Sequence, residues 1–283
     1  MDQKKKKIIS IAGTIVVLLV GYITYEHLSY VTTDNAQIFG HSLMMAPKVS
    51  GYITEVNVVE GQKVSKGDVL VQIDQRDYEN YLKQAKGELA SIEARRRDAE
   101  RNYRRLVDLL SKGAVSQQQF DTSSAQYNDV KAKYDAIASQ VAQAELNLSN
   151  TKIVAPVDGF IAKKSVEVGQ LAAPGVPLLG FIDAGERWII ANFKETEIEG
   201  IKLDAKVEIE VDAISGAKFE GKVESISSAT GATFTLLPPD NATGNFTKVV
   251  QRVPVKIKFV NLTADDVIKL RTGLSAFIKV SKH

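Results

Sequence analysis

One stretch of 76 residues, Gln75–Asn150, constrains the fold more than any other, because it contains no proline and two glycines. Its apolar residues recur at alternating spacings of three and four, which places a narrow stripe along one face of a helix. One stripe precedes Gly113 and a second follows it. We therefore predict two helices of about 35 residues, each roughly 50 Å long at 1.5 Å per residue, that pair as an antiparallel coiled coil.

The two stripes and the turn between them can be assigned residue by residue. The first has Arg96 as its only charged member and consists of Tyr78, Leu82, Ala85, Leu89, Ile92, Arg96, Ala99, Tyr103, Leu106 and Leu110. The second consists of Phe120, Ser123, Tyr127, Val130, Tyr134, Ile137, Val141, Ala144 and Leu148. Gly113 suits the left-handed position just after a helix end. Ser116 can form a capping box with Gln119, flanked by Val115 and Phe120 as a hydrophobic staple, so Lys112–Val115 should form a tight tip.

The flanks of this hairpin form an internal repeat, Ala46–Ile73 before it and Ala155–Phe181 after it. At one offset of 108 residues the copies align Gly51 with Gly159, Tyr52-Ile53 with Phe160-Ile161, Gly61-Gln62 with Gly169-Gln170, Gly67 with Gly175, Leu70 with Leu178 and Ile73 with Phe181. The opening Ala-Pro pairs depart from that offset by one residue. Each copy has short alternating strands and is too small to bury a face alone, so the two together predict one small β-sandwich.

These paired halves resemble the two halves of a biotinyl/lipoyl domain. A coiled-coil hairpin inserted between such halves resembles the membrane fusion proteins, or periplasmic adaptors, of bacterial tripartite efflux pumps and type I secretion systems.

The N-terminus is typical of a membrane anchor. Residues 1–7 carry four consecutive lysines, and residues 8–25 follow without a charge, a length at the lower end for a membrane span. A cleaved signal peptide is the alternative, but no small-x-small cleavage site follows. We therefore predict an uncleaved, single-pass anchor with cytoplasmic lysines. Residues 26–45 follow it as a linker and, as the family resemblance implies, a first barrel strand.

The C-terminal region, 183–283, should be an antiparallel β-barrel with one apolar and one solvated face. Strict alternation runs through Lys206–Asp212 and Val253–Phe259, and Phe219–Ile226 alternates with one glycine interruption. The predicted fold class is thus multidomain α+β, with lipoyl-like halves at 46–74 and 151–182 around the hairpin at 75–150.

Three segments resemble EmrA-type adaptors. Thr33–Ala36 resembles their Thr-Asp-(Asp/Asn)-Ala entry, which in that family joins the barrel. A second segment contains Trp188, Asn192, Phe193, Lys194 and Glu195, and a third, Gly231–Val255, contains Asn241, Gly244, Gln251 and Arg252. These residues either close the barrel through turns or contact a partner or substrate.

The hairpin tip carries a further motif. Adaptors that meet a TolC-like channel tend to show Arg-x3-Leu-x6-Ser, and Arg105, Leu109 and Ser116 have this spacing around Lys112 and Gly113. The alternative is that Ser116 acts only as a helix cap. Six arginines between positions 95 and 105 resemble a nucleic-acid-binding stripe, but the predicted topology places them outside the cytoplasm. We therefore expect no nucleic-acid partner and interpret them as a solvated or inter-subunit face with i,i+4 pairs.

No chemistry of catalysis is indicated. The chain has no cysteine, and His27, His41 and His283 lack a metal-ligand spacing. A lipoyl-type carrier needs a lysine at the turn between its halves, where this chain has the hairpin instead; Lys152 only follows the second helix. We therefore expect no cofactor, no metal and no enzymatic activity.

The resemblance implies an adaptor in the bacterial inner membrane, with its bulk in the periplasm. It would link an inner-membrane transporter of the major-facilitator type to a TolC-like outer-membrane channel, as a trimer or hexamer, for efflux of drugs or toxic compounds. Alternatives are an adaptor for type I protein or peptide secretion, of the HlyD kind, and an envelope tether without transport. The helical arms are short for the EmrA type.

Overall fold

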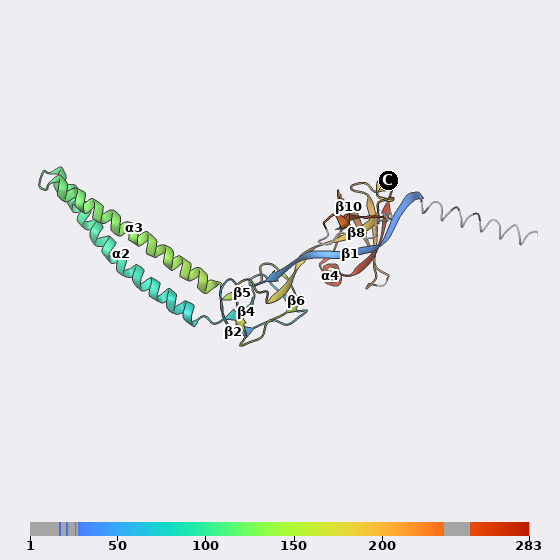
Figure 1. The fold of residues 1–283 in the computed structure, drawn as a ribbon, viewed down its shortest axis with the longest axis horizontal. Helices are drawn as coiled ribbons and strands as arrows, with labels where there is room; N and C mark the ends of the chain where they lie inside the picture. The colour runs from blue at the N-terminus through green and yellow to red at the C-terminus, as the bar shows by residue number, and fades with distance from the viewer. Residues whose placement is uncertain are drawn as a thin grey trace, which may run out of the picture. The chain divides into compact units, whose positions relative to one another are not determined.

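The computed structural model describes residues 28–214, 216–234 and 250–282, together with Val17, Gly21 and Glu26 (Figure 1). In chain order the elements are β1 (Tyr30–Met45), β2 (Gly51–Val56), β3 (Lys63–Val64), β4 (Val69–Ile73), α2 (Arg76–Ser111), α3 (Gln117–Ser149), β5 (Lys152–Val154), β6 (Gly159–Lys164), β7 (Leu171–Ala172), β8 (Leu179–Lys194), η1 (Ile198–Gly200), β9 (Lys206–Val211), β10 (Lys218–Ile226), η2 (Gly231–Phe234), β11 (Arg252–Val260), α4 (Ala264–Lys269) and β12 (Ser275–Ser281). The chain divides into two compact units, residues 1–41 with 183–283, and residues 42–182.

The first unit is an antiparallel β-barrel. Its strands follow the order β1-β12-β9-β10-β11-β8, and β1 also pairs with β8, which closes the ring. Closure removes the exposed edges that an open sheet would leave. The apolar residues of the alternating strands point inward, and Ile189, Ile209, Ile257 and Ile278 are fully buried in this core.

Strand β1 reaches the barrel from the far end of the sequence. It pairs with β12 from Tyr30 against Ser281 to Gln37 against Ser275, with a register shift between Thr33 and Ala36. The early segment therefore joins the barrel, as the family resemblance implied.

The second unit contains a β-sandwich built from the two repeat copies. One sheet has the order β5-β4-β2-β7, and β3 pairs with β6 in the other. Its core includes Ile53, Leu70, Ile73, Ile161 and Phe181, all at most 2% exposed.

The repeat is visible in hydrogen bonds that the copies exchange. The amide of Ile53 donates to Gln170 O at 2.9 Å, and the amide of Ile161 donates to Gln62 O at 3.0 Å. Gly61 and Gly169 take left-handed φ angles of 80° and 86° and donate to Ile161 O and Ile53 O at 2.7 and 2.8 Å. Each bond has its counterpart 108 positions along the chain, so the two copies are related by a pseudo-twofold axis.

The hairpin consists of α2 and α3, of 36 and 33 residues, which lie side by side in Figure 1. At 1.5 Å per residue they are about 54 and 50 Å long. The residues of the two predicted stripes are buried or half-buried, whereas most of their neighbours are exposed.

No helix within the described part of the chain combines the length and hydropathy that crossing a membrane requires. Apart from Val17 and Gly21, the predicted anchor at 8–25 lies outside the described residues.

Candidate functional site: the hairpin and the barrel polar cluster

The seam between α2 and α3 is aromatic toward the tip. Tyr103 stacks on Tyr127 with ring centroids 5.3 Å apart and also lies 5.7 Å from Phe120. Further from the tip, the guanidinium of Arg96 lies 4.8 Å from the centre of the Tyr134 ring. These contacts join α2 to α3 along the seam and favour the register in which the rings and the guanidinium meet.

The tip is closed by its own backbone. The amide of Gly113, at φ 70°, donates to Leu110 O at 2.9 Å, and the amide of Ala114 donates to Leu109 O at 2.9 Å. This pair of bonds is a Schellman motif, which satisfies the last carbonyls of α2. Ser116 begins α3 with a capping box: its hydroxyl accepts from the Gln119 amide at 3.3 Å, and the Ser116 amide donates to the Gln119 side chain at 3.0 Å.

The predicted tip-motif residues face different environments. Arg105, Lys112, Gly113 and Ser116 are exposed, whereas Leu109 is half-buried. Lys112 forms an ion pair with Asp108 at 2.7 Å. The tip is thus a small polar surface over a partly buried leucine, and the cap role of Ser116 coexists with its exposure.

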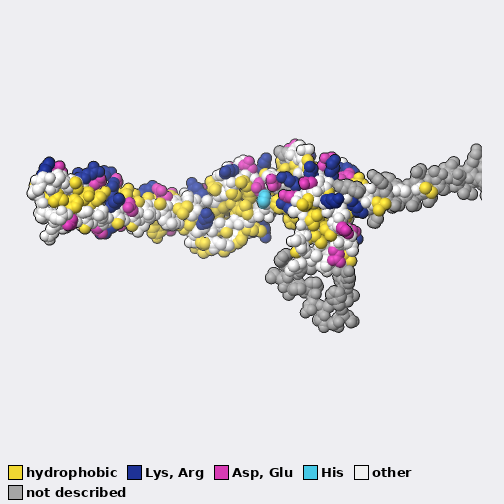
Figure 2. All heavy atoms as spheres, turned by 90° about the horizontal axis from the view of Figure 1, so that it is seen from above, with side chains coloured by type: hydrophobic (Ala, Val, Ile, Leu, Met, Phe, Trp, Pro, Cys, Tyr) yellow, Lys and Arg dark blue, Asp and Glu magenta, His cyan; other side chains and the backbone are white. Residues whose placement is uncertain are grey.

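Basic side chains gather toward the tip half of the hairpin (Figure 2). Several are paired along α2: Arg97 with Glu93 at 2.5 Å and Arg101 with Asp98 at 3.1 Å. Neither Arg95 nor Arg105 forms an ion pair with another described residue. The stripe is largely a helix-supporting face, and Arg105 is a basic side chain next to the tip that is available to a partner.

The root of the hairpin is tied into the sandwich around Thr151, which is fully buried. The Thr151 hydroxyl donates to Leu148 O at 2.6 Å and accepts from the Gln75 side chain at 3.1 Å. Its carbonyl accepts from the Ile73 amide at 2.8 Å. One residue therefore joins the end of α3, the start of α2 and the end of β4.

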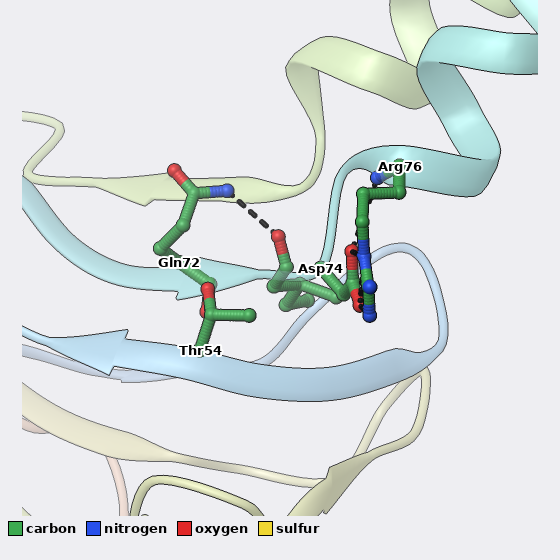
Figure 3. Close-up of polar contacts among 5 residues, drawn as sticks. Thr54, Gln72, Asp74 and Arg76 are labelled. Atoms are coloured by element: carbon green, nitrogen blue, oxygen red, sulfur yellow. Dashed lines mark hydrogen bonds and ion pairs between the residues drawn. The ribbon is translucent and has the colours of Figure 1, made fainter.

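The first turn of α2 is capped from outside the helix by Asp74 (Figure 3). The Asp74 carboxylate accepts from the Arg76 amide at 3.1 Å and from the Arg76 guanidinium Nε at 3.0 Å. The hydrogen bonds from the Arg76 side chain and backbone lower the pKa of the Asp74 carboxyl from 3.8 to about 2. The root thus keeps a negative charge at a helix N-terminus, where the helix dipole favours it.

A polar cluster in the barrel brings together three motif segments that are far apart in sequence. Asn192 of β8 is its centre: its carbonyl accepts from the Thr33 hydroxyl at 3.0 Å, and its side-chain amide donates to Asn35 Oδ1 at 3.1 Å. Arg252 of β11 also donates to the Asn192 carbonyl, at 3.4 Å. We call Thr33, Asn35, Asn192 and Arg252 the barrel polar cluster.

An open hollow of about 270 Å³ lies beside this cluster. Its charged lining residues are Asp34, Lys194, Glu197 and Arg252, and Lys194 lies 3.6 Å from Glu197. Two cations and two anions balance one another, so the hollow offers directional hydrogen bonds of both kinds instead of a strong field of one sign. Within the described residues, no group of three or more His, Asp or Glu side chains is placed to hold a metal.

The structure separates the remaining motif residues. Phe193 is fully buried in the barrel core, and the Glu195 amide donates to Gln251 O at 2.9 Å. Trp188 lies earlier in β8 than these residues. The His41 ring packs edge-on against the Trp188 ring with centroids 4.9 Å apart. Lys256 Nζ lies 5.2 Å from the centre of the Trp188 ring. Asn241 and Gly244 lie outside the described residues.

Sequence reasoning did not select Thr33 and Asn35 as site residues, although it noted their segment as a family motif. Only the pairing of β1 with β8 brings them to Asn192.

The sequence analysis also did not identify Arg187 as a buried residue. It is 5% exposed, bonds the carbonyls of Leu270 and Asp183 at 3.2 and 2.7 Å, and its burial lowers its pKa. A Cβ on Gly40 of β1 would lie 2.8 Å from the Arg187 guanidinium, so this glycine makes room for it.

Comparison with known proteins identifies the family of this fold. The family model described as "RND MFP, barrel-sandwich hybrid domain" matches residues 42–179. A solved MacA–MexA chimera that contains the Pseudomonas aeruginosa MexA α-hairpin domain is 25% identical, with a TM-score of 0.62, and covers 90% of this chain and 82% of its own.

Two curated relatives are similar over most of their length. The multidrug export protein EmrA of Haemophilus influenzae is 32% identical over 295 residues, covering 88% of this chain and 75% of that protein. The colistin resistance protein EmrA of Acinetobacter baumannii is 31% identical over 336 residues, covering 98% of this chain and 95% of that protein. The predicted family is confirmed: the chain belongs to the EmrA-type membrane fusion proteins.

Proposed function

We propose that this chain is the periplasmic adaptor of a multidrug efflux system, joining an inner-membrane transporter to an outer-membrane channel of the TolC type. The observation that carries the proposal is a two-helix hairpin with a compact, exposed tip, in a chain related over nearly its whole length to multidrug export proteins. An adaptor needs no catalytic group. It binds the transporter and the channel and keeps them aligned.

The parts divide this work. Residues 8–25 would anchor the chain in the bacterial inner membrane, with 1–7 in the cytoplasm, and a transporter of the major-facilitator type would bind near the barrel. We assign that contact to Arg252 of the barrel polar cluster and to neighbouring Lys194, because both side chains are exposed, whereas the Asn192 side chain is engaged with Asn35. Three or six copies would surround the transport path, as expected for closed symmetric assemblies.

Crosslinking from the tip tests the proposal directly. A photoreactive residue is placed at Lys112, Ala114 or Gln117, all exposed, in the full chain expressed in cells. Capture of an outer-membrane channel is expected. The control is the same probe at exposed Glu88, which lies about 36 Å along α2 from Lys112 at 1.5 Å per residue. If the tip captures only copies of the same chain, the channel role is wrong.

Charge reversal at the tip provides a matched pair of variants. Arg105→Asp should abolish both channel capture and drug resistance, because arginine supplies directional bonds to carbonyls and carboxylates. Arg95→Asp changes the same residue type on the same helix, about 15 Å further from the tip, and should leave both unchanged. Equal behaviour of the two variants would count against a specific role for Arg105.

A further inference from the structure

The barrel begins close to the point where the proposed anchor would leave the membrane. The uncharged run of residues 8–25 stops just before Glu26, and Leu28 leads into β1. Three residues separate position 25 from Leu28, and an extended chain spans them in at most about 11 Å. If residues 8–25 lie in a bilayer, as the proposed function holds, this end of the barrel lies at the lipid surface.

A loop after β8 lies beside this entry. The Lys282 amide donates to Ser29 O at 3.0 Å, and a Cβ on Gly200 would lie 3.4 Å from the Lys282 side chain. Gly200 ends the short helix η1, and the chain then runs through Leu203 to β9. We call residues 198–205 the η1–β9 loop. This loop is therefore a neighbour of the chain that enters from the anchor.

The η1–β9 loop carries a leucine at its tip. Ile201 and Ala205 are buried and fix the loop to the barrel core. Between them, the Ala205 amide donates to Lys202 O at 3.3 Å, which closes a turn with Leu203 and Asp204 at its tip. Asp204 takes a left-handed φ of 59°, which aspartate tolerates. Turn tips favour polar residues, glycine and proline, yet Leu203 is 61% exposed.

The most exposed apolar residues of the barrel unit gather at this end. Among the described residues after Glu26, they are Leu28 at 66%, Leu203 at 61% and Val250 at 48%. Val250 lies just before β11, whose first residues pair with the end of β8. The other exposed large apolar residues of this unit retain 37 to 44% exposure and are Phe39, Ile268 and Phe277.

The other end of β11 shows that a leucine beside a left-handed residue need not be exposed. Asn261, directly after β11, also has a φ of 59°. The next residue, Leu262, is half-buried and packs against the barrel core. The exposure of Leu203 is therefore not a general consequence of a left-handed neighbour. An apolar group left exposed on a folded surface marks an interaction site.

We infer that the η1–β9 loop and Leu28 contact the lipid surface around the anchor, with Leu203 at the edge of the hydrocarbon. The occupant is lipid because the proposed anchor keeps this end of the barrel at the bilayer. Apolar side chains gain free energy when they enter the boundary between headgroups and acyl chains. Lys202 can keep its ammonium among the headgroups while its stem lies along apolar surface. One leucine binds weakly, so the loop orients an already anchored barrel.

Fluorescence quenching tests this contact in the full chain, which contains no cysteine. Leu203→Cys is labelled with the environment-sensitive dye NBD and reconstituted, without a transporter, into vesicles of phosphatidylethanolamine and phosphatidylglycerol. The control is Ile268→Cys, an exposed apolar site of the same barrel in α4, after β11. Lipid that carries a nitroxide near its headgroup should remove most of the emission from the dye at Leu203 and little at Ile268. Aqueous iodide should quench the control more strongly.

Flotation of the vesicles separates this inference from the proposed anchor. If the chain floats with the vesicles but lipid quenches both sites equally, or neither, the anchor stands and the lipid contact is wrong. If the chain does not float, the anchor and the lipid contact fail together.

A photoreactive residue in place of Leu203 tests the other possible occupant in cells. Capture of a transporter from this position, without lipid quenching in vesicles, would assign the surface to that protein and overturn the inference.

Discussion

The sandwich and the hairpin, joined in one unit, are stabilised in different ways. The sandwich has a closed core in which Leu70, Ile73 and Ile161 are fully buried. The hairpin exposes most of its surface to water, and its most buried apolar seam residues, Ile92, Val130 and Val141, retain 7 to 8% exposure. Because stability follows buried apolar contacts, the sandwich should unfold only globally, whereas the hairpin should open locally from its tip. The rigid sandwich thus supports a hairpin whose tip can open locally.

The largest expected effect is a truncation in the sandwich core. Phe181 is 1% exposed and packs so closely that a Cβ on Gly159 would lie 2.3 Å from its ring. Phe181→Ala should lower the free energy of unfolding by about 3 to 5 kcal/mol, measured by urea denaturation. Val59→Ala, at a site 63% exposed, is the control and should change it by less than about 0.5 kcal/mol. A similar loss of unfolding free energy in both variants would show that the Phe181 core does not dominate the stability of the sandwich.

A truncation in the seam should act more locally. Ile92→Ala should cost about 2 kcal/mol and increase amide hydrogen exchange in α2 and α3, while the sandwich strands stay protected. Val107→Ala on the same helix, 43% exposed, is the matched control. Loss of protection in β2 and β4 together with the helices would break the comparison, because the two regions would then unfold as one.

A smaller effect is expected at the tip. Ser116→Ala removes the cap of α3 and should cost about 1 kcal/mol of local stability, seen as faster exchange in the first turn of α3. Ser116→Asp keeps a side-chain oxygen for the cap and should restore protection. If the alanine variant exchanges at the wild-type rate, the backbone bonds of Gly113 and Ala114 alone hold the tip.

The smallest effect is at the root and depends on pH. A carboxyl whose pKa falls from 3.8 to about 2 on folding stabilises the folded state fully above pH 3.8, and this contribution is lost as the pH falls through about 2. The wild-type melting temperature should therefore drop over this range by more than that of Asp74→Asn, which has no charge to lose. Parallel pH curves for the two proteins would show that the contacts of Asp74 do not stabilise the root.

The hairpin and the repeat were readable from sequence because both are periodic. The spacing of apolar residues set the seam, and the chain's own repeat indicated a two-part sandwich. The contacts that allow Arg96 to lie in the seam could not be predicted in full. Its guanidinium lies 4.8 Å from the centre of the Tyr134 ring and 3.7 Å from the Glu100 carboxylate. The Arg96 Nε has no hydrogen-bond partner among the described residues. The Glu100 contact is an i,i+4 pair within α2, but the Tyr134 contact depends on the facing helix α3.

The barrel was predictable as a class but not in its contacts. Alternation indicated its strands, yet the meeting of Thr33, Asn192 and Arg252 depends on β1 closing the ring beside β8. The helix α4 was missed because six residues are too few to show a period. Its capping box of Thr263 and Asp266 was the one local pattern that could have revealed it.

The way the hairpin joins the sandwich has a mechanical consequence. Its two legs leave from β4 and β5, which are hydrogen-bonded neighbours, through joints of two residues each, 74–75 and 150–151. A pull along the hairpin axis therefore loads both strands in the same direction and does not slide one past the other. The load passes instead to the ladder between β4 and β2, whose bonds lie across the strands and must break together. The arm can thus transmit tension to its base without unzipping it.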